Sequence, residues 1–119
     1  MLSTGSNSKT REMLVKTDFK TTKYQNLVYN SALQMDGVAY VYNGPMNVIG
    51  FVGQTLSQIA SGTVLFTLPY SVSVQQFGGL HGSDGNVYGI QIINGSITTY
   101  NKIPAGVRFR EQIVFFTYI

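Results

Sequence analysis

Residues 87–100 read VYGIQIINGSITTY. Two runs rich in Val, Ile, Tyr and Thr flank the pair Asn94-Gly95. β-Branched and aromatic residues favour the pleated, half-buried surface of a sheet. Asn and Gly accept the positive φ angles that a two-residue hairpin turn requires. The stretch therefore predicts a β-hairpin with strands at 87–93 and 96–100.

Three further pairs of the same kind punctuate the chain. They are Asp36-Gly37, Asn43-Gly44 and Asp84-Gly85, and each lies beside a run of Val, Ile, Tyr or Phe. The repeated pattern predicts an antiparallel meander of short strands, and hence an all-β fold. This class excludes the α/β folds that usually carry nucleotide or redox chemistry. The predicted all-β fold is more typical of a compact module that binds a partner.

The other strands are predicted from the same signals. Pro69 is expected to end one of them, since proline cannot donate a hydrogen bond to a central ladder. Residues 55–61 are predicted to form a loop or one helical turn, and residues 78–85 a turn region. The remaining predicted strands are 27–37, 38–42, 47–53, 62–68, 71–77 and 107–119.

Composition sets the size and the chemistry of the domain. At 119 residues the chain suits one domain, and 44% hydrophobic residues suffice for a core. There is no cysteine, which excludes disulfides, thiolate metal sites and a cysteine nucleophile. One His and five carboxylates show no metal-ligand spacing, so we expect neither a metal nor a cofactor. No apolar run reaches membrane-spanning length, so we expect no membrane insertion, and no signal peptide is recognisable.

The charge is divided unevenly along the chain. Residues 1–24 hold five Lys or Arg against two acidic residues, whereas residues 25–119 hold three of each. A nucleic-acid module would concentrate Lys and Arg on its folded part, so we do not expect a nucleic-acid partner. Residues 1–24 are predicted to be a linker or stalk segment, and residues 25–119 to be the folded head domain.

The last predicted strand is apolar on both faces. Phe109, Ile113 and Phe115 share one parity, while Val114 and Phe116 share the other. A strand of this kind is buried on both sides. Either a loop covers its second face, or that face meets another subunit. We expect a subunit interface made by Phe109, Arg108, Arg110, Val114, Phe116 and Tyr118.

The order of these segments resembles the C-terminal head domain of receptor-binding proteins and tail fibres from phages of Gram-positive bacteria. The resemblance rests on the Gly-Thr-Val-Leu-Phe-Thr-Leu-Pro run at 62–69, the strand at 87–93, the Asn94-Gly95 pair and the apolar run 113–119. It implies a β-sandwich or barrel head, assembled as a homotrimer on an N-terminal stalk. It also implies recognition of cell-wall saccharides or teichoic acids. The chain departs from the family where Pro69 is followed by Tyr70-Ser71-Val72, and it has no Trp.

The candidate saccharide ligands lie in or near predicted loops. His, Ser and Asp side chains can bond sugar hydroxyls, and tyrosine combines an apolar ring with a wet hydroxyl. A solvated loop is the plain alternative for the segment 81–84. A Ser-His-Asp triad is not expected from adjacent residues in a glycine-rich turn, so no catalytic residue is predicted. The predicted saccharide-binding residues are Tyr70, His81, Ser83, Asp84 and Tyr88.

These observations predict a non-catalytic adhesion module on the tail tip or baseplate of a virion, acting outside the cell. Its expected partners are host cell-wall polysaccharide or teichoic acid, two further copies of itself, and other tail or baseplate proteins through the N-terminal segment. Arg108 and Arg110 are expected to pair with acidic residues of a neighbour, or to clamp a phosphate of a phosphosaccharide. The alternatives are a structural virion component without glycan binding and a small polysaccharide depolymerase.

Overall fold

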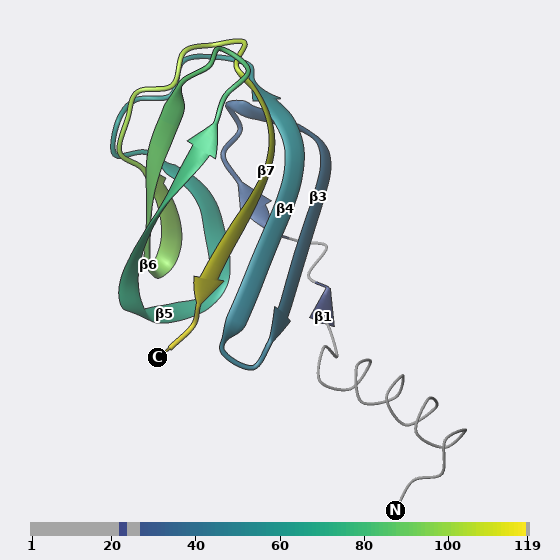
Figure 1. The fold of residues 1–119 in the computed structure, drawn as a ribbon, viewed down its shortest axis with the longest axis vertical. Helices are drawn as coiled ribbons and strands as arrows, with labels where there is room; N and C mark the ends of the chain where they lie inside the picture. The colour runs from purple at the N-terminus through teal and green to yellow at the C-terminus, as the bar shows by residue number, and fades with distance from the viewer. Residues whose placement is uncertain (1–21, 24–26, 119) are drawn as a thin grey trace, which may run out of the picture.

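The computed structural model describes residues 22–23 and 27–118, and the described part is all-β. Its strands form two antiparallel sheets, a four-stranded sheet in the order β1-β3-β4-β7 and a three-stranded sheet in the order β2-β5-β6 (Figure 1). Only β1 falls within the predicted linker or stalk of residues 1–24, and the rest of that segment lies outside the described residues. The strands are β1 (Thr22–Lys23), β2 (Val28–Tyr29), β3 (Leu33–Asn43), β4 (Met46–Thr55), β5 (Val64–His81), β6 (Val87–Thr99) and β7 (Arg108–Phe116).

The four-stranded sheet is built around the β3–β4 hairpin. Asn43 pairs with Met46, and Gly44 takes a φ of 58° in the turn between them. This confirms the turn predicted at Asn43-Gly44. After the excursion through β5 and β6, the chain returns as β7 and pairs with β4, so the order is not a simple meander.

The three-stranded sheet contains fewer and longer strands than the sequence predicts. β5 runs through Pro69 without a break, and β6 runs through Asn94-Gly95. The predicted end at Pro69 and the predicted hairpin at 94–95 are therefore wrong. Pro69 is accommodated because the ladder between β5 and β6 shifts register between Thr67 and Val72. A proline without an N–H leaves no donor unpaired where the ladder is interrupted.

Two of the four Asn/Asp-Gly pairs are bulges rather than turns. Asn94 has a φ of 55° inside β6, opposite Val72. Asp36-Gly37 lies inside β3, where the register shifts between Met35 and Gly37. A residue that tolerates positive φ or an irregular ladder serves a β-bulge as readily as a turn.

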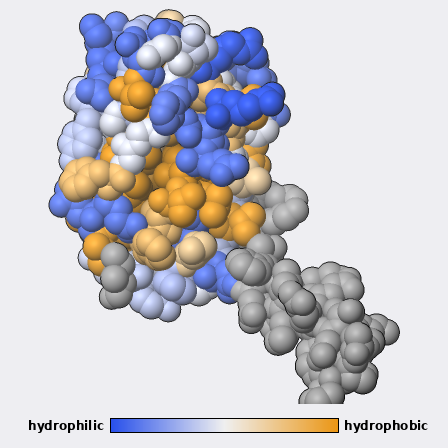
Figure 2. Space-filling model, in the orientation of Figure 1, coloured by the Kyte–Doolittle hydropathy of each residue, from blue (hydrophilic) through white to orange (hydrophobic). Residues whose placement is uncertain are grey.

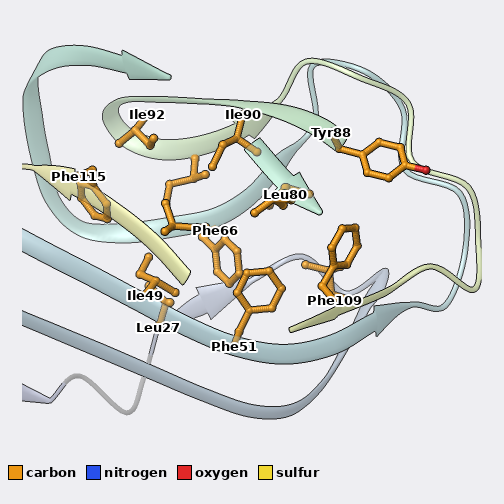
Figure 3. Close-up of a cluster of buried hydrophobic side chains, with 14 of the residues drawn as sticks. Leu27, Ile49, Phe51, Phe66, Leu80, Tyr88, Ile90, Ile92, Phe109 and Phe115 are labelled. Atoms are coloured by element: carbon orange, nitrogen blue, oxygen red, sulfur yellow. The ribbon is translucent and has the colours of Figure 1, made fainter. Parts of the chain in front are cut away.

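The two sheets enclose one apolar core (Figure 3). Phe51 and Phe66 meet edge to face across the sheets, with ring centroids 5.3 Å apart. Phe51 also lies 6.2 Å from Phe109 of β7. The core thus fixes β7 against β4 on one side and against the three-stranded sheet on the other.

In the part of the chain that the structure describes, there is no helix long and apolar enough to cross a membrane.

Candidate functional site

The candidate site begins at the turn of residues 82–86, which joins β5 to β6. Gly85 takes a φ of 84°, and its N–H donates to the Gly82 carbonyl at 3.0 Å. Asp84 accepts the N–H of Asn86 at 3.1 Å, as an Asx turn does. The turn predicted at Asp84-Gly85 is therefore confirmed.

This turn is fastened to β7 of the opposite sheet. The Ser83 N–H donates to the Arg108 carbonyl at 2.9 Å, and the Arg108 N–H donates to Ser83 Oγ at 2.9 Å. Gly82 bridges to Phe109. A Cβ on Gly82 would lie 2.7 Å from the Val107 side chain, so only glycine allows this approach.

His81 is held at the same junction by Glu111. One carboxylate oxygen of Glu111 accepts the His81 backbone N–H at 2.8 Å and lies 3.1 Å from its Nδ1. Burial raises the pKa of the Glu111 carboxyl, but its interactions with His81 and the Gln112 N–H together outweigh burial and leave that pKa below its usual value. The carboxylate therefore orients the imidazole, whose side chain stays largely exposed.

Between the turn and β7 lies an open hollow of about 340 Å³, here called the turn–strand hollow. It is lined by Val52, His81, Gly82, Ser83, Arg108, Phe109 and Arg110. A second hollow of about 460 Å³ adjoins it and shares Val52 and Arg110 with it. Arg110 therefore stands where the two hollows meet.

The two arginines differ in their partners. Arg108 lies 3.8 Å from Asp36 of its own chain, at the bulge of β3. The partner that the sequence suggested in a neighbouring subunit is thus available within the same chain. Among the described residues Arg110 has no ion-pair partner, so its guanidinium is free to bind an anion or a hydroxyl.

Tyr88 occupies a different position from the one expected of a ligand-binding residue. Its ring is 5% exposed and lies 6.0 Å from the Phe109 ring, while its hydroxyl points away from the core (Figure 3). That hydroxyl donates to the Asp84 carboxylate. The bond raises the pKa of Tyr88 and lowers the pKa of Asp84. The hydrogen bond between Tyr88 and Asp84 thus stabilises the turn of residues 82–86.

Tyr70 does not belong to this site. Its side chain is half-buried, and its hydroxyl donates to Asn47 Oδ1 at the β3–β4 hairpin. Burial raises the pKa of the Tyr70 phenol, with an opposing effect from the Thr117 hydroxyl. The Tyr70 hydroxyl therefore helps to hold the β3–β4 hairpin, and its role as a saccharide ligand stays a prediction.

The three residues that resemble a catalytic triad in sequence have separate partners. Among the described residues, no hydrogen bond joins His81, Ser83 or Asp84 to one another. His81 contacts Glu111, Ser83 contacts Arg108, and Asp84 contacts Tyr88 and Asn86. No group of three His, Asp or Glu side chains that could hold a metal occurs in residues 22–23 and 27–118.

The predicted interface residues divide by parity along β7. Phe109 is buried in the chain's own core and is unavailable to a second subunit, so it is removed from that set. The other predicted residues all face outward and are exposed, namely Arg108, Arg110, Val114, Phe116 and Tyr118. Parity alone separates the two groups, because alternate side chains of a strand point to opposite faces.

The outward residues join apolar rows across the four-stranded sheet. Val114 lies opposite Val48, which lies opposite Val41, and Phe116 lies opposite Met46. These five residues are called the apolar rows below. Figure 2 shows apolar surface in the lower middle of the molecule, where β7 runs in Figure 1.

Sequence reasoning missed two contributors to the site. The sequence does not indicate that Glu111 holds His81, or that Asp36 lies beside Arg108 of the same chain. Both are non-local contacts, which a single sequence does not reveal.

No family model matches this chain, and neither does any curated protein or solved structure.

Proposed function

We propose that this chain is a non-catalytic adhesion module, the receptor-binding head of a phage tail, and that it binds cell-wall saccharide or teichoic acid of a Gram-positive host. The ligand site is the turn–strand hollow. Exposed hydrogen-bonding groups of His81 and Ser83 lie there beside the two guanidiniums of β7. These groups suit hydroxyls and phosphates, which are the polar groups of such polymers.

One observation carries the proposal: the charged side chains of this weakly charged domain gather at one place. Residues 25–119 hold six charged side chains and the single His. Lys102 is the one charged residue that neither lines the hollow nor takes part in a contact described above. The other five are Asp36, Asp84, Arg108, Arg110 and Glu111. Such a concentration on an otherwise neutral surface favours a polar ligand at this point.

The proposal includes a homotrimer carried on the virion, with the N-terminal segment reaching other tail or baseplate proteins. The apolar rows support a subunit contact, since adjoining apolar residues at the surface mark interaction sites, and Met46, Val114 and Phe116 of these rows are exposed. An open hollow binds a sugar weakly, with a Kd on the order of mM to µM. Three linked copies convert such affinities into firm adhesion through effective concentration.

The test is binding of the purified protein to immobilised cell-wall polysaccharide and to teichoic acid from Gram-positive cells. Arg110→Gln should weaken binding about tenfold or more, because a hydrogen bond to a charged group contributes roughly 1.5–3 kcal/mol. Ser83→Ala should weaken it less, since it removes a neutral hydroxyl. Arg110 is exposed, so neither the fold nor the thermal midpoint should change.

Lys102→Gln is the matched control, because it removes one positive charge outside the charged cluster. It should bind like the wild type. If neither polymer binds the wild-type protein, or if both charge-removing variants lose affinity equally, the hollow is not a specific site. In that case the structural virion component becomes the better reading of the apolar rows.

A further inference from the structure

A pair of exposed aromatic rings lies on the outer face of the three-stranded sheet. Phe77 of β5 is 63% exposed, and Tyr100, just after β6, is 47% exposed. Their ring centroids are 5.7 Å apart and the rings are inclined by 17°. The two rings thus contact each other, and the rest of their surface is exposed to solvent instead of packing in the core.

Two glycines lie on the same face of the sheet as the rings. Phe77 lies opposite Gln91, and Gly79 lies opposite Gly89 on the same outward face. A Cβ on Gly89 would meet the Tyr100 side chain at 3.6 Å. The Tyr100 N–H donates to the Gly89 carbonyl at 2.8 Å, which fixes Tyr100 against this glycine.

Amide groups stand at the border of the aromatic pair. Asn101 is exposed, and its Oδ1 accepts the Gly89 N–H at 2.6 Å. Within the described residues its NH₂ group makes no hydrogen bond, so both N–H donors are available to a ligand. The half-buried Gln91 side chain makes no hydrogen bond within the described residues. None of these side chains carries a charge.

We propose that Phe77 and Tyr100 form a second binding site, for a neutral pyranose ring. The apolar C–H face of a sugar fits an exposed aromatic ring, while amides at the border take its hydroxyls. A protein partner fits less well. The free surface of two rings is on the order of 200 Å², against about 800 Å² per partner in a stable protein interface. The two amides are uncharged, which likewise favours a neutral ligand over a phosphosaccharide.

The site stands apart from the turn–strand hollow, and the experiment separates the two. Maltotriose, cellotriose and chitotriose are the probes, titrated by saturation-transfer NMR against the full chain. At least one should bind, with the strongest transfer to ring C–H protons. Phe77→Ala and Tyr100→Ala should each weaken binding about tenfold, whereas Arg110→Gln should leave it unchanged. That pattern persists even if the hollow binds no wall polymer.

Two controls keep the result specific. Val87→Ala removes an exposed apolar side chain from the same face, outside the aromatic pair, and should bind normally. Phe77→Leu keeps apolar bulk without a π face and should bind as weakly as Phe77→Ala. Circular dichroism should show that every variant is folded, because these side chains lie outside the core.

The proposal is overturned if none of the three sugars binds, or if Phe77→Ala binds them as the wild type does. It is also overturned if light scattering shows that the wild type self-associates and Phe77→Ala does not, since the rings would then be a contact between copies of the chain.

Discussion

Asn47 is a polar side chain with no exposed surface, and it joins the ends of several strands. Its Oδ1 accepts the hydroxyls of Tyr40 and Tyr70. Its Nδ2 donates to Thr117 Oγ1 at 2.8 Å and to the Pro45 carbonyl at 3.1 Å. The amide thus ties the β3–β4 turn to the chain beyond β7, and no apolar residue reproduces these bonds.

Replacing this amide should be among the costliest single changes in the domain. Asn47→Ala should lower the free energy of unfolding by about 2–4 kcal/mol, because it deletes buried hydrogen bonds and leaves a cavity. Urea denaturation measures the loss. Gln58→Ala, at an exposed loop position, should change the same quantity by less than about 0.5 kcal/mol. A loss below about 1 kcal/mol for Asn47→Ala would mean that water replaces the amide.

Glu111 makes the stability of the junction depend on acid. Its pKa is depressed in the folded state, so its contribution is complete above the ordinary carboxyl pKa and disappears as pH falls through the folded value. The wild type should therefore lose stability between about pH 5 and pH 3, and Glu111→Gln should lose less over the same interval. Urea midpoints measured across that range provide the comparison, and parallel curves would contradict the assignment.

At the level of elements, substitutions in β6 can distinguish a bulge from a turn at Asn94-Gly95. A type I′ hairpin at Asn94-Gly95 would need positive φ at both positions. In the structure only Asn94 has it, and a Cβ on Gly95 would make ordinary contact at 3.7 Å. Gly95→Ala should thus be nearly neutral, whereas Asn94→Val should cost about 1–2 kcal/mol of unfolding free energy. If the two variants lost equal unfolding free energy, the result would favour a hairpin turn over a bulge at this position.

The sequence predicts the strand positions well and the connections between them poorly. Residues 47–53 and the turn at Asn43-Gly44 are predicted because alternation and turn chemistry are local. Asn94-Gly95 and Asp36-Gly37 mislead because a bulge and a turn draw on the same backbone freedom. Pairing with the neighbouring strand decides whether such a pair forms a bulge or a turn, and that pairing involves residues far away in sequence.

The candidate site shows the same limit. His81 and Ser83 are predicted from side-chain chemistry, and their neighbour Arg108 from its place on the last strand. That these three share one hollow depends on the turn of one sheet bonding to a strand of the other. That Tyr70 lies elsewhere is not evident from the sequence, because its partner, Asn47, lies 23 residues away.

For the whole molecule, the outer face of the four-stranded sheet is the surface that would hold the proposed trimer together. Val114 is 57% exposed and lies in the apolar rows. Val114→Lys should convert a mass near three chains into a monomer, because a lysine cannot be buried there unpaired. Size exclusion with light scattering measures the mass. Gln75→Lys, on the other sheet, should remain trimeric.

A wild-type monomer would contradict the trimer, and a Val114→Lys trimer would move the interface elsewhere. Val114 is already in contact with water in the single chain, so the variant should keep its β-sheet circular dichroism spectrum.

The attachment of the 82–86 turn to β7 also affects how the domain would respond to a pulling force. The described domain is entered at β1, toward the lower right of Figure 1, while this turn lies near the top. A pulling force between β1 and a ligand held at the turn would act along the length of the strands. Ladder hydrogen bonds would then be sheared together instead of unzipped one at a time. Strand β1 pairs with β3 at only two positions and is the first described strand of the chain, so it would detach before the longer ladders of the sandwich.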